Sequence, residues 1–344
     1  MAAPSDGAHS AVFSSRFDDS DAFSEAVHGA AIEFAPLPAH RYHAELVSIA
    51  LGDVRLQQSS MSPNRARGSV DPASASILLL TEPTPGILVN GRPLGREHVA
   101  LLRPGEEFQG LAPAGLSWAS ITIDLASFDA LCNAWQLQAT ARDTLLAGAE
   151  MASLDPLRQG VAAVADLAKT LPATFADASV AAALSGALID LLSAARFERS
   201  AEPTRSLRTA EAMRIVTRAE DYLASRLSQP IYSHELSRAL GVSERSLFGA
   251  FAAVCGTSPH AYLKFRRLLL VRRALRNGGG DARQVKSVAL AHGFWHFGNF
   301  ARDYRLAFGE NPSQTLQHAR GGQYGPDTAG LRAAALIGQA VPAF

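Results

Sequence analysis

The stretch VALAHGFWHFGNFARDYRLAFGENPSQTL (288–316) decides the fold of the C-terminal third of this chain. Apolar residues recur in it at steps of three and four, which is the period of a helix with one buried face. Gly293 and Gly309 interrupt the pattern, and glycine tolerates the left-handed conformation found at helix ends. The stretch therefore predicts a short helix, a tight turn and a second helix over about residues 296–307.

The same layout occurs upstream in SHELSRALGVSERSLFGAFAAVCG (233–256). Here Gly241 makes the turn and Ser243 is placed to cap a helix over 244–254. Two helices joined in this way form a helix-turn-helix unit, whose second helix can enter the major groove of DNA. Some residues of each helix-turn-helix unit are expected to face the interior. In the upstream helix-turn-helix unit they are Leu236, Ala239, Leu240, Leu247 and Phe251, and in the downstream one they are Val285, Val288, Ala289, Ala291, Phe300, Tyr304 and Phe308.

The exposed faces of the two reading helices carry side chains that suit DNA. Arg245 and Arg302 can each make two hydrogen bonds to guanine, and Asn299 can contact adenine. A solvated helix face would also be polar, but two such units joined by a basic helix favour the DNA interpretation. The residues predicted to contact DNA are Ser243, Glu244, Arg245, Ser246, Lys264, Arg267, His296, Phe297, Gly298, Asn299 and Arg302.

The joining segment SPHAYLKFRRLLLVRRALRNGG (258–279) predicts a basic helix. Ser258 suits the cap position and Pro259 the first helical position. We expect some of its charged side chains to contact phosphate and others to stay in water. Leu263, Leu270 and Ala274 are expected on its buried stripe, and its positive charge comes from Lys264, Arg266, Arg267, Arg272, Arg273 and Arg276.

Charge is divided unevenly along the chain. Residues 1–203 hold 13 Lys+Arg and 23 Asp+Glu, whereas residues 204–320 hold 18 and 8, although the whole chain has a formal net charge of zero. This asymmetry is expected where one part of a protein faces a polyanion. Basic residues that only solvate helices would give the same count, because charge concerns partners rather than fold.

These motifs resemble the DNA-binding domain of the AraC/XylS transcription regulators over about residues 208–318. The most specific matches are Gly293, Phe294, Phe300, Tyr304, Phe308, Gly309 and Pro312, together with Leu236, GVSERSL, Phe251, the run from Gly256 to Leu263 and RRLLLVRRAL. The run GFWHFGNF also resembles the ethanolamine-utilisation regulators within that family. The resemblance implies a regulator that binds double-stranded DNA, responds to a small-molecule effector and acts on RNA polymerase. Many relatives have a polar or basic residue where this chain has Phe248 and Gly249. In the upstream helix-turn-helix unit, the resemblance therefore implies no base contact beyond that of Arg245.

The N-terminal half has a different pattern. Short apolar runs separated by glycine and proline occupy residues 39–124, and Asn90-Gly91 is a hairpin signal. Residues 126–198 change to a helical period, in which Val180, Leu184, Leu188, Leu191 and Ala195 share a stripe. This stripe fits either an interior face or the seam of a homodimer. The strand pattern fits an antiparallel barrel or a sandwich. The family likeness implies a cupin-like β-barrel followed by dimerisation-type helices.

The sequence therefore predicts an α+β protein whose C-terminal domain is all α-helical. The predicted parts are a disordered N-terminus (1–12), an effector-binding and dimerisation domain (13–200), a linker (201–207), a double helix-turn-helix DNA-binding domain (208–320) and a flexible tail (321–344). The start of the chain lacks the features of a signal peptide, and no apolar run is long enough for a membrane span, so we expect a cytoplasmic protein with no membrane partner.

The sequence also suggests functions other than that of a regulator. His40, His43, Glu45 and His98 raise a metal-dependent cupin-type enzyme fused to a DNA-binding module, but the remaining ligand spacing is missing. We accordingly predict no catalytic residue, metal or cofactor, and no enzymatic activity. Cys132 and Cys255 are expected to be small buried side chains. A DNA-binding architectural protein that takes no effector stays open as a third possibility.

Overall fold

The computed structural model describes residues 11–38, 40–135, 145–149, 151–199, 207–226, 228–229, 231–277 and 283–320. The chain forms two compact units, of which the first contains residues 1–33 and 42–203 and the second residues 34–41 and 204–344. The predicted tail (321–344), most of the predicted linker and residues 1–10 lie outside the described residues. The domain limits derived from the sequence therefore stay predictions.

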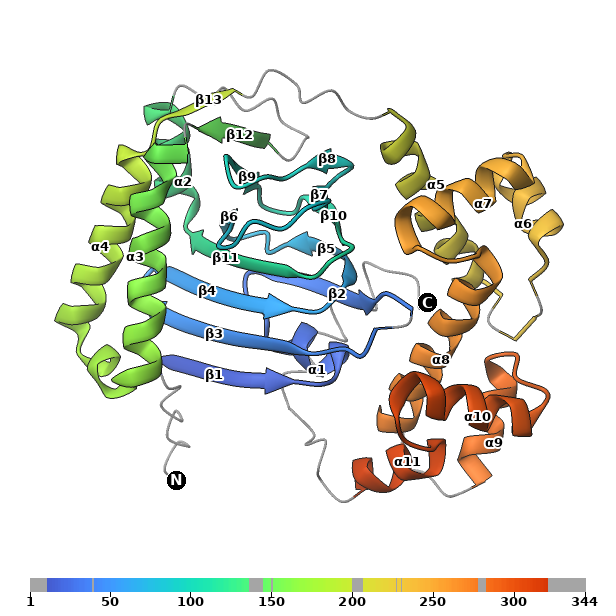
Figure 1. Cartoon of the computed structure of the whole chain (residues 1–344). Helices are drawn as coiled ribbons and strands as arrows, with labels where there is room; N and C mark the ends of the chain where they lie inside the picture. Colours follow the sequence, from blue (N-terminus) through green and yellow to red (C-terminus); the bar gives the residue numbers. More distant parts are fainter. Residues whose placement is uncertain are drawn as a thin grey trace. The chain divides into compact units, whose positions relative to one another are not determined.

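The first unit contains two sheets (Figure 1). The eight-stranded sheet has the order β1-β3-β4-β11-β6-β9-β12-β13, and the five-stranded sheet has the order β2-β5-β10-β7-β8. Both orders begin and end at an edge strand, so the predicted closed barrel is not confirmed. The strands of the larger sheet are β1 (Val12–Phe17), β3 (Ala44–Leu51), β4 (Val54–Met61), β6 (Ala75–Leu80), β9 (His98–Leu102), β11 (Leu116–Ile123), β12 (Leu145–Ala149) and β13 (Phe197–Arg199). Those of the smaller sheet are β2 (Ala30–Pro36), β5 (Asn64–Val70), β7 (Leu88–Val89), β8 (Arg92–Pro93) and β10 (Glu107–Ala112).

The two faces of the larger sheet pack against different layers, because successive residues of a strand point to opposite sides. In β6, Ile77 and Leu79 join a core shared with the helices, whereas Leu80 joins a core with Phe108 and Ala112 of the smaller sheet. The helices that cover the first face are α2 (Leu125–Ala134), α3 (Met151–Thr170), η1 (Pro172–Ala176) and α4 (Ala178–Ala194), and α1 (Ser20–Ala26) follows β1. Figure 1 shows α3 and α4 side by side along this sheet.

The stripe on α4 faces the interior of its own unit. Leu188 and Ala195 are 1% and 2% exposed in the core that α4 shares with the larger sheet, and Leu184 and Leu191 pack against it. Of the two interpretations left open by the sequence, the interior face is therefore confirmed for these four residues of the stripe, whereas Val180 is partly exposed and lies outside this core. Cys132 is buried in the same core, and Cys255 is buried in the second unit, as predicted.

Three parts of the first unit differ from the sequence pattern or add to it. The prediction of helices throughout 126–198 is wrong at two strands. In β12, Leu145 pairs with Leu101 of β9, and β13 pairs with β12. Pairing with the edge of an existing sheet overrode the local period there. The strands β1 and β2 were not predicted. The hairpin at Asn90-Gly91 is confirmed, since both residues have positive φ (50° and 74°) between the paired strands β7 and β8.

The C-terminal part of the second unit, from residue 207 to residue 320, is helical, as predicted. Its helices are α5 (Leu207–Ala224), α6 (Ser233–Leu240), α7 (Glu244–Cys255), α8 (Pro259–Asn277), α9 (Arg283–Ala291), α10 (Phe297–Phe308) and α11 (Pro312–Arg320). Gly241, Gly256, Gly293 and Gly309 have φ between 65° and 78°, and each ends a helix or lies in the turn after one. Among the residues that the structure describes, no helix is long and apolar enough to cross a membrane.

Candidate nucleic-acid interface

The first helix pair, α6 and α7, has the predicted turn. Gly241 ends α6 in the left-handed conformation, and the hydroxyl of Ser243 accepts a hydrogen bond of 3.0 Å from the backbone N–H of Ser246. Leu236, Leu247 and Phe251 are buried at 1%, 0% and 0% exposure. The buried sides of α6 and α7 thus anchor the pair, and the N-terminal end of α7 is held in a fixed direction.

The exposed side of α7 carries four of the residues predicted to contact DNA, which include its N-cap. Ser243, Glu244, Arg245 and Ser246 are all exposed. Phe248 is 42% exposed on the same helix, and a Cβ added to Gly249 would meet nothing within 4 Å. This face therefore presents one cation and one apolar ring, beside a position where another molecule could approach the helix backbone closely.

The cap of α7 gives a first prediction. Ser243→Ala removes the acceptor for the Ser246 N–H, and we expect a loss of about 1 kcal/mol in the free energy of unfolding. Urea unfolding of the full chain, followed by circular dichroism, measures it. The matched control is Ser246→Ala, which keeps the backbone donor and should lose less than about 0.5 kcal/mol. Equal stability of Ser243→Ala and the wild type would contradict this role.

The second pair, α9 and α10, is anchored by a chain of aromatic rings. The ring centroids of Phe294 and Phe300 are 5.0 Å apart, those of Phe300 and Tyr304 5.7 Å, and those of Tyr304 and Phe308 4.7 Å. Phe300 and Tyr304 are buried at 3% and 0% exposure, and Ala289 lies in the same core. The predicted anchoring residues of this pair are confirmed, apart from Ala291, which is exposed at the end of α9.

The exposed side of α10 carries the other predicted contacts. His296, Phe297, Gly298, Asn299 and Arg302 are all exposed, and the Arg302 side chain is 66% open to solvent. Its guanidinium lies 3.5 Å from the carboxylate of Asp303, which is a weak restraint for an exposed arginine.

Sequence reasoning missed one residue beside this face. Trp295 is 62% exposed in the turn before α10. A signal was present, because the turn carries Trp295, His296 and Phe297 in succession, and three consecutive side chains cannot all point to one buried face.

The joining helix α8 uses part of its charge inside the protein. Arg266 is 4% exposed, and its Nε lies 3.6 Å from a carboxylate oxygen of Glu220, to which the Tyr262 hydroxyl also donates a hydrogen bond. Arg266 therefore fits neither of the two outcomes expected for the charged side chains of this helix, contact with phosphate or exposure to water, because a buried guanidinium paired with a carboxylate cannot reach DNA.

The two predicted DNA contacts on α8 also have partners in the protein. The Lys264 Nζ lies 2.6 Å from the Asp303 carboxylate, with 40% of the lysine side chain exposed. The Arg267 guanidinium donates a hydrogen bond to the backbone carbonyl of Gln229, and burial lowers the pKa of this guanidinium. Lys264 thus connects α8 to α10, and Arg267 holds the loop before α6.

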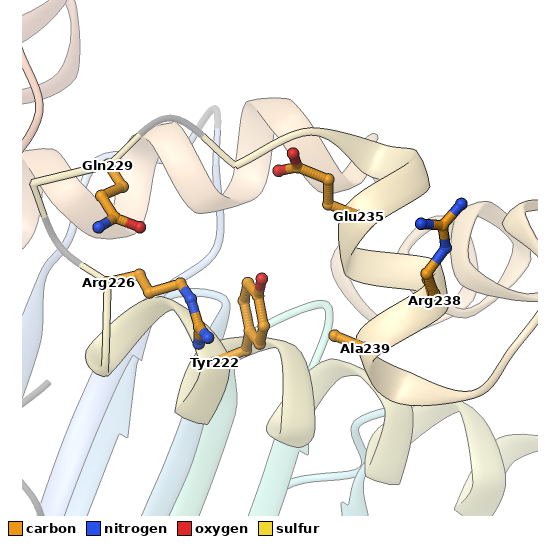
Figure 2. A pocket seen from close by; sticks show the side chains of 6 residues that line it. All are labelled: Tyr222, Arg226, Gln229, Glu235, Arg238 and Ala239. Carbon is orange, nitrogen blue, oxygen red and sulfur yellow. The ribbon is translucent and has the colours of Figure 1, made fainter.

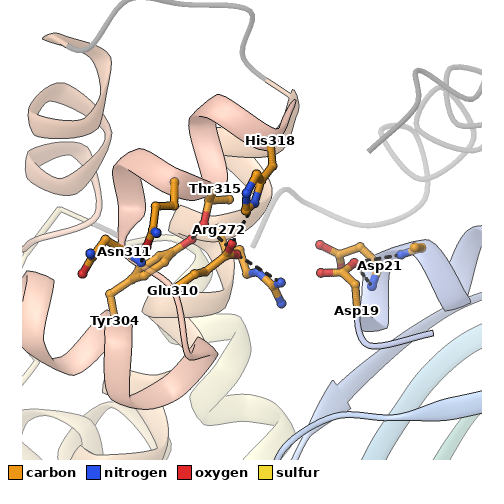
Figure 3. Close-up of polar contacts among 10 residues, drawn as sticks. Asp19, Asp21, Arg272, Tyr304, Glu310, Asn311, Thr315 and His318 are labelled. Atoms are coloured by element: carbon orange, nitrogen blue, oxygen red, sulfur yellow. Dashed lines mark hydrogen bonds and ion pairs between the residues drawn. The ribbon is translucent and has the colours of Figure 1, made fainter. Parts of the chain in front are cut away.

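A polar network fixes α11 to the second helix pair (Figure 3). Glu310 accepts hydrogen bonds from Arg272 (3.3 Å) and from the Thr315 hydroxyl (2.8 Å). The Thr315 hydroxyl lies 2.8 Å from the Tyr304 hydroxyl, and His318 Nδ1 lies 3.2 Å from Glu310. The network joins α8, α10 and α11, so it supports the position of α10 from the side away from its exposed face.

A pocket of about 410 Å³ lies between the end of α5 and α6 (Figure 2). Its lining residues are Tyr222, Arg226, Gln229, Glu235, Arg238 and Ala239. The Arg226 guanidinium lies 4.2 Å from the centroid of the Tyr222 ring. Ala239 was expected to face the core, and this prediction is wrong because α6 turns its Leu236 and Leu240 side inward. None of the residues predicted to contact DNA lines this pocket.

The histidines considered as metal ligands differ in their surroundings. His40 and His43 are exposed, while His98 Nδ1 accepts a hydrogen bond of 3.1 Å from the Gly95 N–H. Within the described ranges, no three His, Cys, Asp or Glu side chains are grouped so that they could hold a metal ion. No observation therefore favours the metal-dependent enzyme.

Comparison with known proteins shows similarity in the C-terminal third of the chain, which contains α6 to α11. A helix-turn-helix domain family matches residues 236–318. The XylDLEGF operon transcriptional activator of Pseudomonas putida is 35% identical over 103 residues, which are 30% of this chain and 32% of that protein. The probable thc operon regulatory protein of Rhodococcus erythropolis is 37% identical over 103 residues, which cover 30% of this chain and 31% of that protein. A solved structure of a probable AraC family transcriptional regulator from Rhodopseudomonas palustris is 40% identical, with 31% of this chain and 98% of that chain covered and a TM-score of 0.29. The likeness thus spans about a third of the length of these curated relatives.

Proposed function

We propose that the protein is a sequence-specific DNA-binding transcription regulator of the AraC type and not an enzyme, because its C-terminal third matches a helix-turn-helix domain family and is similar to a transcriptional activator. The observation that best supports this function is the pair of exposed helix faces on α7 and α10. Each follows a glycine turn, and they present Arg245 on one helix and Asn299 and Arg302 on the other. In this proposal α6–α7 and α9–α10 are two helix-turn-helix units, whose second helices enter the major groove.

The test is a salt-dependent binding assay with the full chain. A duplex from the promoter region beside the protein's own gene is compared with a random duplex of equal length. We expect preferential binding whose affinity falls as salt rises, because contacts between cations and phosphates release counterions. Binding without preference would favour an architectural protein, and the absence of binding by a folded protein would refute the proposal.

A glycine on the first reading helix gives a second prediction. Gly249 lies in the middle of α7, where alanine is favoured over glycine by about 1 kcal/mol, and no neighbour would contact an added Cβ. If DNA approaches α7 at this point, Gly249→Ala stabilises the protein by about 0.5 to 1 kcal/mol and weakens DNA binding by about 1 to 2 kcal/mol.

The matched control for Gly249→Ala is Gly186→Ala in the middle of α4, where an added Cβ would also meet nothing within 4 Å. This change should raise the unfolding temperature in the same way and leave DNA affinity unchanged. DNA affinity of Gly249→Ala equal to that of the wild type would show that DNA does not approach the helix at Gly249.

The proposal extends to a small-molecule effector held between the two sheets of the first unit. Val54 and Leu56 of β4 face the helices, so the alternate residues Gln57 and Ser59 point to the other side. Both are buried, at 0% and 4% exposure, and the Gln57 Nε2 and Ser59 Oγ atoms have no hydrogen-bond partner in the described structure. A polar group of an effector would satisfy such atoms. A thermal-shift screen of small metabolites tests this part, and Gln57→Leu should abolish any shift that depends on the amide.

A homodimer and contact with RNA polymerase are the remaining parts of the proposal, and a regulator of this kind acts in the cytoplasm. Since the Leu188 side of α4 is used in the core, a dimer that uses α4 must employ its exposed side, which carries Ala182, Ala183 and Ala187. Sedimentation of the full chain measures the oligomeric state.

A further inference from the structure

Two aromatic side chains at the start of α10 are open to solvent, although the rings that follow them are buried. Trp295 is 62% exposed and Phe297 is 36% exposed, whereas Phe300 is 3% exposed. Aromatic side chains contribute most to cores and interfaces because they can cover a large apolar area. Both rings therefore leave apolar area uncovered, and this area is available to another molecule.

The groups around this pair identify the kind of molecule. The Lys286 Nζ lies 5.9 Å from the centroid of the Phe297 ring, and both Asn299 and Arg302 are exposed on α10. The segment 204–320 carries ten more basic than acidic side chains. Apolar rings beside cations and an amide, on a basic segment, fit the major groove of DNA, in which phosphates flank base edges.

We propose that Trp295 and Phe297 contact the 5-methyl groups of thymine, so that α10 selects sites with thymine at defined positions. The inference rests on the proposed function. Thymine is the base whose major-groove edge carries an apolar group, and aromatic side chains can cover it. Arg302 and Asn299 read guanine and adenine by hydrogen bonds, whereas the two rings read a base that offers a methyl group.

The experiment separates the methyl group from the rest of the base. The full-length wild type first selects binding sites from a library of random duplexes. Each thymine of the selected site is then replaced by deoxyuridine, which pairs in the same way but lacks the methyl group. We expect about fourfold weaker binding by the wild type at the positions covered by the rings, the effect of one lost buried methyl group.

The variants assign this effect to the two rings. Trp295→Ala and Phe297→Ala should bind thymine and deoxyuridine equally well at the position that each ring covers. The control is Leu306→Ala, which removes another exposed apolar side chain of α10 (79% exposed) and should keep the full discrimination. Circular dichroism of each variant should match that of the wild type. A lower unfolding temperature is expected for Phe297→Ala alone, because this ring is the most covered of the three altered side chains.

The outcomes are distinct. Loss of discrimination in either ring variant, with Leu306→Ala unaffected, supports the proposal. Unchanged discrimination in both ring variants overturns it while leaving the regulator in place. Failure of the wild type to select any sequence overturns the proposed function itself, and this inference with it.

Discussion

Glu220→Ala is expected to lower the free energy of unfolding of the second unit by about 3 to 5 kcal/mol. Glu220 is 5% exposed and interacts with both Arg266 and the Tyr262 hydroxyl, which are 4% and 0% exposed as residues. Its removal leaves a guanidinium buried without this carboxylate and a hydroxyl without its acceptor. Since whole domains are stable by only about 5 to 15 kcal/mol, the loss is a large part of the total.

The measurement combines urea unfolding of the full chain with hydrogen exchange, which locates the loss in α5 and α8. The matched control is Glu211→Ala on the same helix, whose carboxylate lies 3.7 Å from Arg214 with 53% of its side chain exposed. An exposed pair of this kind contributes about 0 to 1 kcal/mol. Glu220→Gln, which keeps an oxygen acceptor for Tyr262 but no charge, should fall between the two. If Glu220→Ala and Glu211→Ala are equally stable, the buried pair is not a major stabilising interaction.

Arg302→Ala and Asn299→Ala should each weaken binding to the selected operator by about 1 to 3 kcal/mol, and binding to random DNA much less. Both side chains are exposed on α10, and the only ion pair described for Arg302 among the residues that the structure covers is the 3.5 Å contact with Asp303. The expected loss of affinity is larger on the operator than on random DNA, because a contact with a base forms only where the correct base is present.

The control for these two changes is Arg305→Ala, which removes an exposed arginine from the last turn of the same helix. It should reduce affinity for operator and random DNA to a similar, small extent, through charge alone. Titrations of both duplexes with each variant, at several salt concentrations, give the comparison. Equal losses on operator and random DNA for Arg302→Ala and Asn299→Ala would remove them from the base-reading residues.

Features that depend on neighbouring residues could be predicted from the sequence. The turns at Gly241 and Gly293, the cap at Ser243 and the buried rings Phe300 and Tyr304 all follow from local periodicity and from the conformations that glycine and serine favour. The helices of the second unit follow for the same reason, because a period of three to four residues is complete within one helix.

Features that depend on distant residues could not be predicted. Arg266 looked like any other cation of a basic helix, and only the packing of α5 against α8 brings Glu220 to it. The pairing of β12 with β9 depends on a sheet edge that the helical period of its own segment does not reveal. Trp295 was overlooked because the helical period assigns no face to a side chain that lies in the turn between two helices, whereas its exposure is decided by the direction of that turn.

The joining helix has a consequence for the DNA. With 19 residues, α8 is a rod about 28 Å long, and Lys264 fixes it to α10 through Asp303. A rod of this kind does not stretch, so α7 and α10 keep a set separation. In the proposed complex with DNA, this separation is the same whatever sequence lies between the two segments that they would read. Any mismatch with the repeat of the double helix must then be absorbed by bending of the duplex. Sites that differ only in the flexible pyrimidine–purine steps of this central, untouched stretch should therefore differ in affinity, because stiffness itself becomes a readable property of the sequence.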